Sequence, residues 1–274
     1  MKIRFHIILI LALLVSSCGE YERLLKSTDY DLKKAKAKEF YDAGQYVKAS
    51  ELLSQILPRF RASSEAEDLN WMNAMCSYNS KDYFMASTLF KQFNEMFPFG
   101  VHAEEGNFMA AFCDYKIAPR PELDQESTKS AIDGFTLFIN KFPGSPKVEE
   151  SMKYKKELEE KLVEKSYHNA RLYYDMKKYK AAIVALNNGL KEYTDSKYRE
   201  EMMFLKLNSL FLYAEKSFVT KQRERYQDTL DDYFSFMEEF PKSQHSKEVA
   251  IIYEKTNNYL KSVGATSEQT GANN

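Results

Sequence analysis

An internal repeat restricts the possible folds of this chain more than any other feature. The segment 70–78 aligns with the segment 107–115 at an offset of 37 residues, and five of the nine positions are identical. Trp71 and Phe108 are aromatic at a further shared position. Because strand-like alternation of apolar and polar residues is rare along the chain, the repeat is predicted to be a pair of helices.

A second signature places an aromatic residue three positions before an alanine. It occurs at 44–49, 81–86 and 177–182. The aromatic side chain is predicted to fill the turn between two helices, and the small alanine lets those helices approach closely. An apolar residue follows each alanine one helical turn later on the same face; these residues are Leu53, Phe90 and Leu186.

The predicted helical pairs end alike, at an apolar residue that precedes proline. Proline cannot continue a helix, and it biases the residue before it away from helical angles. The pairs close at Leu57-Pro58, Phe97-Pro98, Phe142-Pro143 and Phe240-Pro241, while the segment 193–196 takes the same place in the fourth pair.

This pattern resembles the tetratricopeptide repeat, whose unit is two antiparallel helices. We therefore predict an all-α fold, a tetratricopeptide-repeat superhelical solenoid of about five helical hairpins plus a C-terminal capping helix. The predicted hairpins are 32–62, 66–101, 103–146, 164–197 and 200–244, and the capping helix is 247–263.

The first 18 residues predict export and a lipid anchor. Lys2 and Arg4 precede an apolar run at 5–15, which two serines separate from Cys18, and this order is typical of a secretory signal. A cysteine at the cleavage point resembles the lipobox of bacterial lipoproteins, so Cys18 is predicted to be lipidated. The run is too short for a transmembrane anchor, which needs about 20 apolar residues, and the cysteine argues against plain secretion.

These features divide the chain into five predicted parts. The small, polar C-terminal residues are expected to be disordered, as chain ends often are. The parts are a lipoprotein signal peptide at 1–17, a lipidated N-terminal tether at 18–31, N-terminal repeats at 32–146, C-terminal repeats with the capping helix at 147–263, and a disordered tail at 264–274.

Composition and motifs argue against several functional classes. The 39 basic and 40 acidic residues give a net charge of −1, which disfavours a nucleic-acid binder. None of the four histidines pairs with another at helical spacing, and there is no glycine-rich phosphate loop or nucleophile elbow. We expect no enzyme activity, no metal and no cofactor other than the covalent lipid on Cys18.

Apart from the predicted lipid-bearing Cys18, the mature chain holds two cysteines, at equivalent positions of successive repeats. Equivalent helices in a stacked array lie about 10 Å apart, whereas a disulfide needs Cα atoms within about 7 Å. Cys76 and Cys113 are therefore predicted to be reduced, buried residues that pack like small apolar side chains.

An array without catalytic residues is predicted to bind protein along the face made by the first helix of each pair. Amides can bond the backbone of an extended peptide, and aromatic rings can cover its side chains. The candidate groove residues are Asn70, Asn73, Asn107 and Asp114. An equally weighted alternative is that Asn70 and Asn107 only satisfy contacts between repeats.

The motifs together resemble one family. The lipobox is followed by 44–49, by Leu123-Asp124-Gln125, and by two Phe-Pro-x-Ser endings at 142–145 and 240–243. Over nearly the whole mature chain this is similar to the BamD family of outer-membrane β-barrel assembly lipoproteins, in a form like that of Bacteroidetes.

The resemblance implies a location and partners. It implies a lipid-anchored protein on the periplasmic face of the outer membrane, which binds the POTRA domains of a BamA-like barrel protein and unfolded outer-membrane proteins. The first three hairpins would receive substrate, and the last two would face the barrel protein. Arg199, Arg223 and Arg225 are the candidate partner contacts.

Two other classes of protein fit the sequence less well. A Tol-Pal coordinator carries similar repeats but normally lacks a lipobox, so Cys18 discriminates against it. Glycan-binding lipoproteins with repeats carry long insertions that this chain lacks.

Mass spectrometry of the mature N-terminus tests the anchor. We expect cleavage after Ser17 and a Cys18 that carries one amide-linked and two ester-linked acyl chains. A mature chain that begins at an unmodified Gly19, or that retains Met1, would contradict the prediction.

Overall fold

The computed structural model describes residues 19–271, and every regular element in that span is an α-helix. This confirms the predicted all-α fold. The predicted signal peptide and Cys18 lie outside the described residues. Within residues 19–271, no helix combines the length and the apolar character that a bilayer crossing requires.

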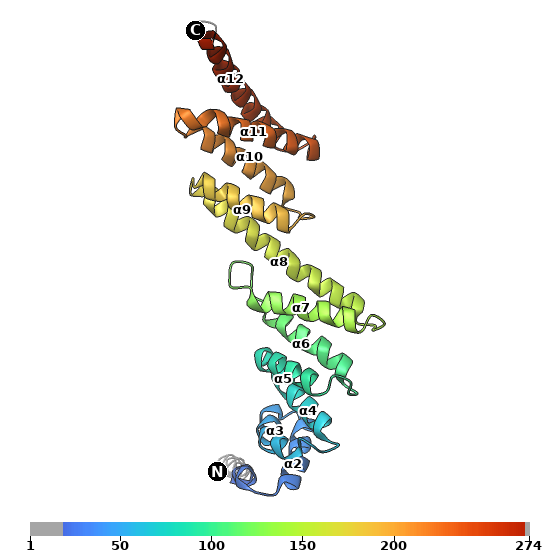
Figure 1. Cartoon of the computed structure of the whole chain (residues 1–274). Coiled ribbons are helices and arrows are strands. Elements are labelled where there is room, and N and C mark those ends of the chain that lie inside the picture. The colour runs from blue at the N-terminus through green and yellow to red at the C-terminus, as the bar shows by residue number, and fades with distance from the viewer. Residues whose placement is uncertain (1–18, 272–274) are drawn as a thin grey trace, which may run out of the picture. The chain divides into compact units, whose positions relative to one another are not determined.

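Successive helices pair into hairpins (Figure 1). A short helical segment at 19–26 comes first. The following helices are α2 (Tyr30–Asp42), α3 (Tyr46–Phe60), α4 (Ala66–Asn79), α5 (Tyr83–Met96), α6 (Ala103–Ile117), α7 (Glu126–Lys141), α8 (Val148–Asp175), α9 (Tyr179–Glu192), α10 (Arg199–Glu215), α11 (Val219–Glu239) and α12 (Ser246–Gly271). The pairs α2–α3, α4–α5, α6–α7, α8–α9 and α10–α11 match the five predicted hairpins, and α12 follows them.

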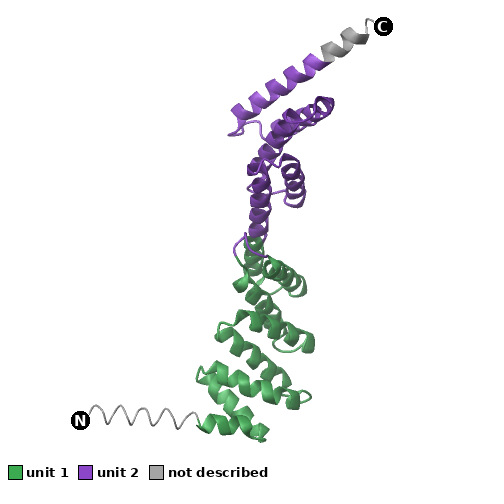
Figure 2. Ribbon diagram, turned by 90° about the vertical axis from the view of Figure 1, so that its left-hand side faces the viewer, with its two compact units in different colours: residues 1–119, 125–158 green, residues 120–124, 159–274 purple. Residues whose placement is uncertain are grey.

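The described chain divides into two compact units (Figure 2). Unit 1 holds the residues up to Pro119 together with 125–158, and unit 2 holds 120–124 and the residues from Glu159 onward. This division differs from the boundary expected at 146/147, and α8 begins earlier than position 164, where the fourth hairpin was expected to start. Because no proline or glycine interrupts 148–175, α8 forms one 28-residue helix, and the boundary falls inside it.

The aromatic–alanine signature does what its spacing predicts. Ala49, Ala86 and Ala182 are fully buried, each near the start of the second helix of a hairpin. The apolar residues one turn later, Leu53, Phe90 and Leu186, are also at 0 % exposure. Small and large side chains thus alternate along one face of the helix, and this face forms the hydrophobic core of each hairpin.

The turn before each signature has one repeated geometry. Gly44, Lys81 and Lys177 adopt left-handed angles, with φ of 72°, 63° and 59°. In each case this residue donates its N–H three residues back and the next residue donates five residues back, for example Gly44 N to Tyr41 O at 3.0 Å and Gln45 N to Phe40 O at 2.8 Å. This pair of bonds is the Schellman motif, which favours glycine at the left-handed position.

A ring or cation at the start of one hairpin lies on a ring of the hairpin before it. The ring of His102 stacks on Trp71 at 4.6 Å between centroids, and the ring of His245 stacks on Phe204 at 3.8 Å. Two further pairs repeat the contact: Tyr198 on Tyr167 at 4.5 Å, and the Lys147 ammonium over Phe108 at 4.3 Å. Each first member lies five residues after the aromatic residue that ends the preceding hairpin. His102 is therefore part of the interface between the α4–α5 hairpin and the α6–α7 hairpin.

The serine of the Phe-Pro-x-Ser endings joins the same interface. The hydroxyls of Ser145 and Ser243 donate to Glu104 at 2.6 Å and to Glu200 at 2.7 Å, and both acids lie on the first helix of the preceding hairpin. Gly100 takes the place of the serine after the second hairpin, where a Cβ would overlap the Glu67 carboxylate. Glu67 instead accepts the N–H of His102 directly at 2.9 Å.

Residues 19–31 of the predicted tether are largely helical, and they pack against the first hairpin. Tyr21 lies edge-on to Phe40 with centroids at 5.6 Å, and its hydroxyl donates to Glu51 at 2.7 Å. The buried Lys33 ammonium donates to Leu25 O at 2.9 Å and to Gln55 at 2.6 Å. The apolar residues at the start of the mature chain cause the difference, because they join the core of this hairpin.

The C-terminal helix is also longer than predicted. Helix α12 continues to Gly271, whereas the capping helix was expected to end at 263 and a disordered tail to follow. No proline stops the helix in this stretch, and extending an existing helix by one residue costs far less than starting one.

The cysteine prediction is confirmed. Cys76 and Cys113 are both free and buried. Burial raises the pKa of each thiol to about 12, so neither forms the reactive thiolate near neutral pH.

The left-handed turn gives a stability prediction. Replacing Lys81 by Gly removes the steric cost of a Cβ at positive φ, so we expect the free energy of unfolding to rise by about 0.5–1 kcal/mol. The matched control is Lys38→Gly in the exposed middle of α2, which should lower it by about 1 kcal/mol. Denaturant unfolding followed by circular dichroism measures both, and a destabilised Lys81→Gly variant would contradict the turn geometry.

Candidate functional site

Two of the predicted groove residues line a pocket in unit 1. Asn70 and Asn73, from α4, form one wall of a pocket of about 580 Å³. Side chains from the end of α3 and from the end of α5 complete it; these are Ser54, Leu57, Pro58, Arg61, Met96 and Phe97. We call this the unit 1 pocket.

The two amides of the unit 1 pocket keep hydrogen-bonding capacity. The Asn70 side-chain N–H donates to Ala66 O at 2.7 Å, and the Asn73 side-chain oxygen accepts from Ser50 at 2.9 Å. No described residue bonds the remaining Asn70 oxygen or the Asn73 amide nitrogen. The pocket therefore offers one acceptor and one donor beside apolar surface, together with the exposed cation of Arg61.

The other two predicted groove residues have internal roles. Asn107 is 7 % exposed and donates to Ala103 O at 2.7 Å within its own helix. Asp114 is 4 % exposed, and its carboxylate accepts from Ser87 at 2.5 Å, Lys91 at 2.7 Å and Ser130 at 2.6 Å. These donors lie on α5 and α7, on either side of α6. Asp114 thus joins three helices, and neither residue lines the unit 1 pocket.

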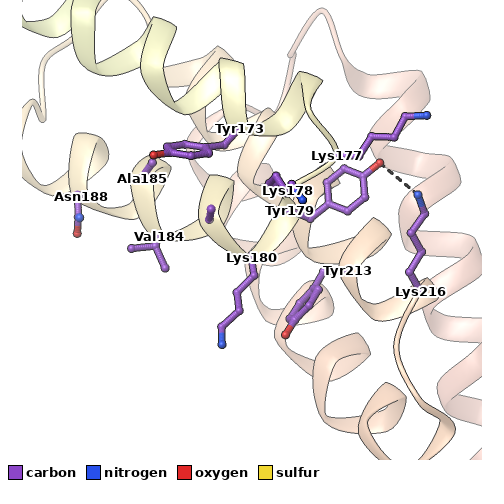
Figure 3. Close-up of a pocket in the computed structure, with 11 residues that line it drawn as sticks. Tyr173, Lys177, Lys178, Tyr179, Lys180, Val184, Ala185, Asn188, Tyr213 and Lys216 are labelled. Atoms are coloured by element: carbon purple, nitrogen blue, oxygen red, sulfur yellow. Dashed lines mark hydrogen bonds between the residues drawn. The ribbon is translucent and has the colours of Figure 1, made fainter.

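A larger pocket of about 830 Å³ lies in unit 2, among the end of α8, α9 and α10 (Figure 3). Its lining contains three tyrosines, four lysines, three small aliphatic residues and one amide, and no carboxylate. The residues are Tyr173, Lys177, Lys178, Tyr179, Lys180, Ala181, Val184, Ala185, Asn188, Tyr213 and Lys216. We call this the unit 2 pocket.

None of the residues that line the unit 2 pocket was predicted from the sequence to belong to a binding site. Lys177, Lys178 and Lys180 belong to the third aromatic–alanine signature, which was interpreted only as helix packing. The available signal was charge, because this copy carries three lysines where the copy at 44–49 carries one. The tyrosines come from three different helices, so no local pattern in the sequence connects them.

The tyrosines of the unit 2 pocket differ in their surroundings. Tyr179 is buried, and the Lys216 ammonium lies 4.9 Å from its ring centroid and 3.5 Å from its hydroxyl (Figure 3). The Arg225 guanidinium lies 3.9 Å from the ring centroid of Tyr213. Tyr173, in contrast, is 44 % exposed, so its ring is open to a ligand.

The three predicted partner contacts are not equivalent. Arg199 donates through two nitrogens to Glu239 on α11, which raises the pKa of the guanidinium, and it also donates to Leu190 O at 3.3 Å. Arg225 lies on Tyr213 and donates to the Ser217 hydroxyl. Arg223 is exposed and forms no ion pair with the described residues, so it is the one of the three that is available to a partner.

Comparisons with known proteins identify a family. Residues 33–210 match the YfiO family, described as outer membrane lipoprotein. No curated protein matches the chain.

Among solved structures, the TPR2AB domain of yeast Sti1 in complex with pHSP90 is 14 % identical, covers 83 % of this chain and 98 % of its own, and has a TM-score of 0.36. A Podospora anserina protein with nearly identical TPR-like repeats is 13 % identical, covers 78 % of this chain and 96 % of its own, and has a TM-score of 0.32. These scores are too low to add to the fold described above.

The contrast between Asp114 and Asn70 gives a second prediction. Asp114→Ala leaves the buried Ser87 hydroxyl, the half-buried Ser130 hydroxyl and the exposed Lys91 ammonium without their shared acceptor, so we expect the free energy of unfolding to fall by about 2–3 kcal/mol. Asn70→Ala removes only a bond within its own helix and should change it by less than about 0.5 kcal/mol. Thermal unfolding of the two variants measures the difference, and equal melting temperatures would contradict the internal role of Asp114.

Proposed function

Because the chain belongs to the YfiO family of outer membrane lipoproteins, we propose that it is a non-enzymatic scaffold of the β-barrel assembly machinery. In this proposal it is anchored through lipid on Cys18 at the periplasmic face of the outer membrane. It binds unfolded outer-membrane proteins and the POTRA domains of a BamA-like barrel protein, and it promotes folding and insertion without chemistry of its own. The family match also favours this function over that of a Tol-Pal coordinator.

The unit 1 pocket is the observation that carries the substrate half of the proposal. An unfolded β-strand presents backbone N–H and C=O groups, which need an acceptor and a donor; the free atoms of Asn70 and Asn73 offer one of each. Leu57, Met96 and Phe97 offer apolar surface for a terminal aromatic side chain. Arg61 offers a cation for the carboxylate that ends such a chain.

The adjoining loop extends the apolar surface of this half. Phe99 and Val101 lie two and four residues after Phe97 and are 95 % and 90 % exposed. Apolar side chains exposed to this degree are typical of surfaces that bind another chain. We assign them to the same substrate-binding region.

The barrel-protein half of the proposal rests on unit 2. Its last hairpin presents Arg223 free of internal pairing, and the turn between α10 and α11 exposes Phe218 at 87 % and Val219 at 77 %. An apolar centre with a charged rim is the usual composition of a surface that binds a folded partner domain. The free energy of binding is expected to come mainly from the apolar side chains, with Arg223 contributing orientation.

Site-specific photocrosslinking in living cells tests the division of roles. A photoreactive residue at position 70 should crosslink to newly made outer-membrane proteins, and one at position 223 should crosslink to a single large barrel protein. Lys38, exposed on α2 and outside the unit 1 pocket, is the control position and should give neither product. Crosslinks of both sites to unrelated periplasmic proteins would overturn the proposal.

A charge reversal sharpens the test of the first half. Arg61→Glu should reduce the position 70 crosslinks to substrate severalfold, because it opposes the terminal carboxylate. It should leave the position 223 crosslink unchanged, since Arg61 lies in the other unit.

A further inference from the structure

We propose that the unit 2 pocket binds an acidic, extended polypeptide segment that carries at least one large apolar side chain. The inference deepens the partner-binding half of the proposed function, and it rests on that function only in taking the ligand to be a polypeptide. It concerns a site that is separate from Arg223, which does not line the pocket.

The first argument is unpaired positive charge. Lys177, Lys178 and Lys180 are exposed, and none of their side chains forms an ion pair or hydrogen bond with the described residues. Other lysines of unit 2 behave differently, for example Lys206, which pairs with Asp232 at 2.5 Å. Since no carboxylate lines the pocket, its cations are left for an external anion.

Two further cations are fixed beside the free ones. The Lys216 ammonium is held near Tyr179, and the Arg225 guanidinium is held over Tyr213. Each cation lies against an aromatic ring, and Arg225 also donates to the Ser217 hydroxyl. The pocket thus combines three exposed, unpaired lysine side chains with the positioned Lys216, and Arg225 lies beside it on the ring of the lining residue Tyr213.

The second argument is the apolar surface between the cations. Tyr173 and Val184 are 44 % and 55 % exposed. Ala181 and Ala185 also line the pocket, and their short side chains leave space for a ligand group. A leucine or phenylalanine side chain placed there would remove these groups from water, at about 25 cal/mol for each Å² that is buried. A purely ionic ligand would leave this surface exposed.

The combination of charged, apolar and amide groups in the unit 2 pocket indicates the class of its ligand. Lysine acts as a point charge without the bidentate geometry that arginine offers to phosphate, and no arginine is among the lining residues. The N-terminus of α9, from Lys178 to Ala181, also lies in the pocket wall, and its backbone N–H groups suit a side-chain carboxylate. Asn188 offers an amide for a peptide backbone. Charges spread over a wall that also carries apolar and amide groups suit alternating acidic and apolar side chains of an extended chain. We therefore favour a polypeptide over a lipid headgroup.

Fluorescence anisotropy with the purified full chain tests the inference. The probe is a short fluorescein-labelled peptide in which Glu and Asp alternate with Leu and Phe. The double variant Lys177→Glu, Lys180→Glu should weaken binding about tenfold or more, and raising the salt concentration should weaken binding to the wild type. Lys242→Glu, an equally exposed lysine of unit 2 outside the pocket, is the matched control and should change the affinity less than about twofold.

A second variant separates apolar from ionic recognition. Val184→Asp should weaken binding of the probe severalfold, and a probe with serine in place of Leu and Phe should bind the wild type as weakly. Circular dichroism and the melting temperature verify that each variant is folded, as expected for exposed positions. Binding that is unaffected by all three substitutions, or no binding of the acidic probe at all, would overturn the inference.

Vesicles distinguish the remaining ligand class. Binding to phosphatidylglycerol vesicles that Lys177→Glu, Lys180→Glu abolishes, without binding of the acidic peptide, would also overturn the inference in favour of a lipid headgroup. The crosslinks at positions 70 and 223 report on the proposed function separately. Their loss with intact peptide binding would reject that function and leave the pocket assignment standing, and the reverse result would reject only the pocket assignment.

Discussion

The contact between the start of one hairpin and a ring of the preceding hairpin is the interaction on which the rest of this structure depends. A single hairpin cannot bury its apolar face alone, so each needs a neighbour in a fixed register. Trp71, Phe108, Tyr167 and Phe204 supply the ring, and His102, Lys147, Tyr198 and His245 lie on it. The acids Glu67, Glu104 and Glu200 bond the same connections and so fix the direction in which each following helix begins.

The sequence allowed the hairpins to be predicted because their signals are local. An aromatic before an alanine, and a proline after an apolar helix, act within a few residues of themselves. The length of α8 was missed for the complementary reason: the stretch 148–175 holds no proline or glycine, and no local signal marked the expected start of the fourth hairpin at 164. The start of the mature chain was interpreted as a tether because its packing leaves no local signal: the partners of Tyr21 lie in α2 and α3.

The candidate sites show the same limit. Asp114 and Asn73 are both polar residues on the first helix of a hairpin, so the sequence does not distinguish their roles. Asp114 is enclosed by donors from α5 and α7, whereas Asn73 borders a pocket. Whether a polar residue is open or enclosed depends on the neighbouring helices. The unit 2 pocket could not be predicted, since Tyr173, Tyr179 and Tyr213 come together only when α8, α9 and α10 pack. The two pockets also differ in character: one presents amides and apolar groups with a single cation, and the other presents several cations around tyrosine rings.

The helical segment at 19–26 has a mechanical consequence. Tyr21, Leu24 and Leu25 of this segment pack against the core of the first hairpin, and Gly19 is joined by one peptide bond to the cysteine predicted to carry acyl chains. A flexible linker between the anchor and the first hairpin would let the folded part of the chain move away from the bilayer. In this chain the helical segment at 19–26 connects Cys18 to the first hairpin without a flexible linker. A lipid on Cys18 would therefore hold the first hairpin at the membrane surface, and force on the lipid would be transmitted directly to folded structure.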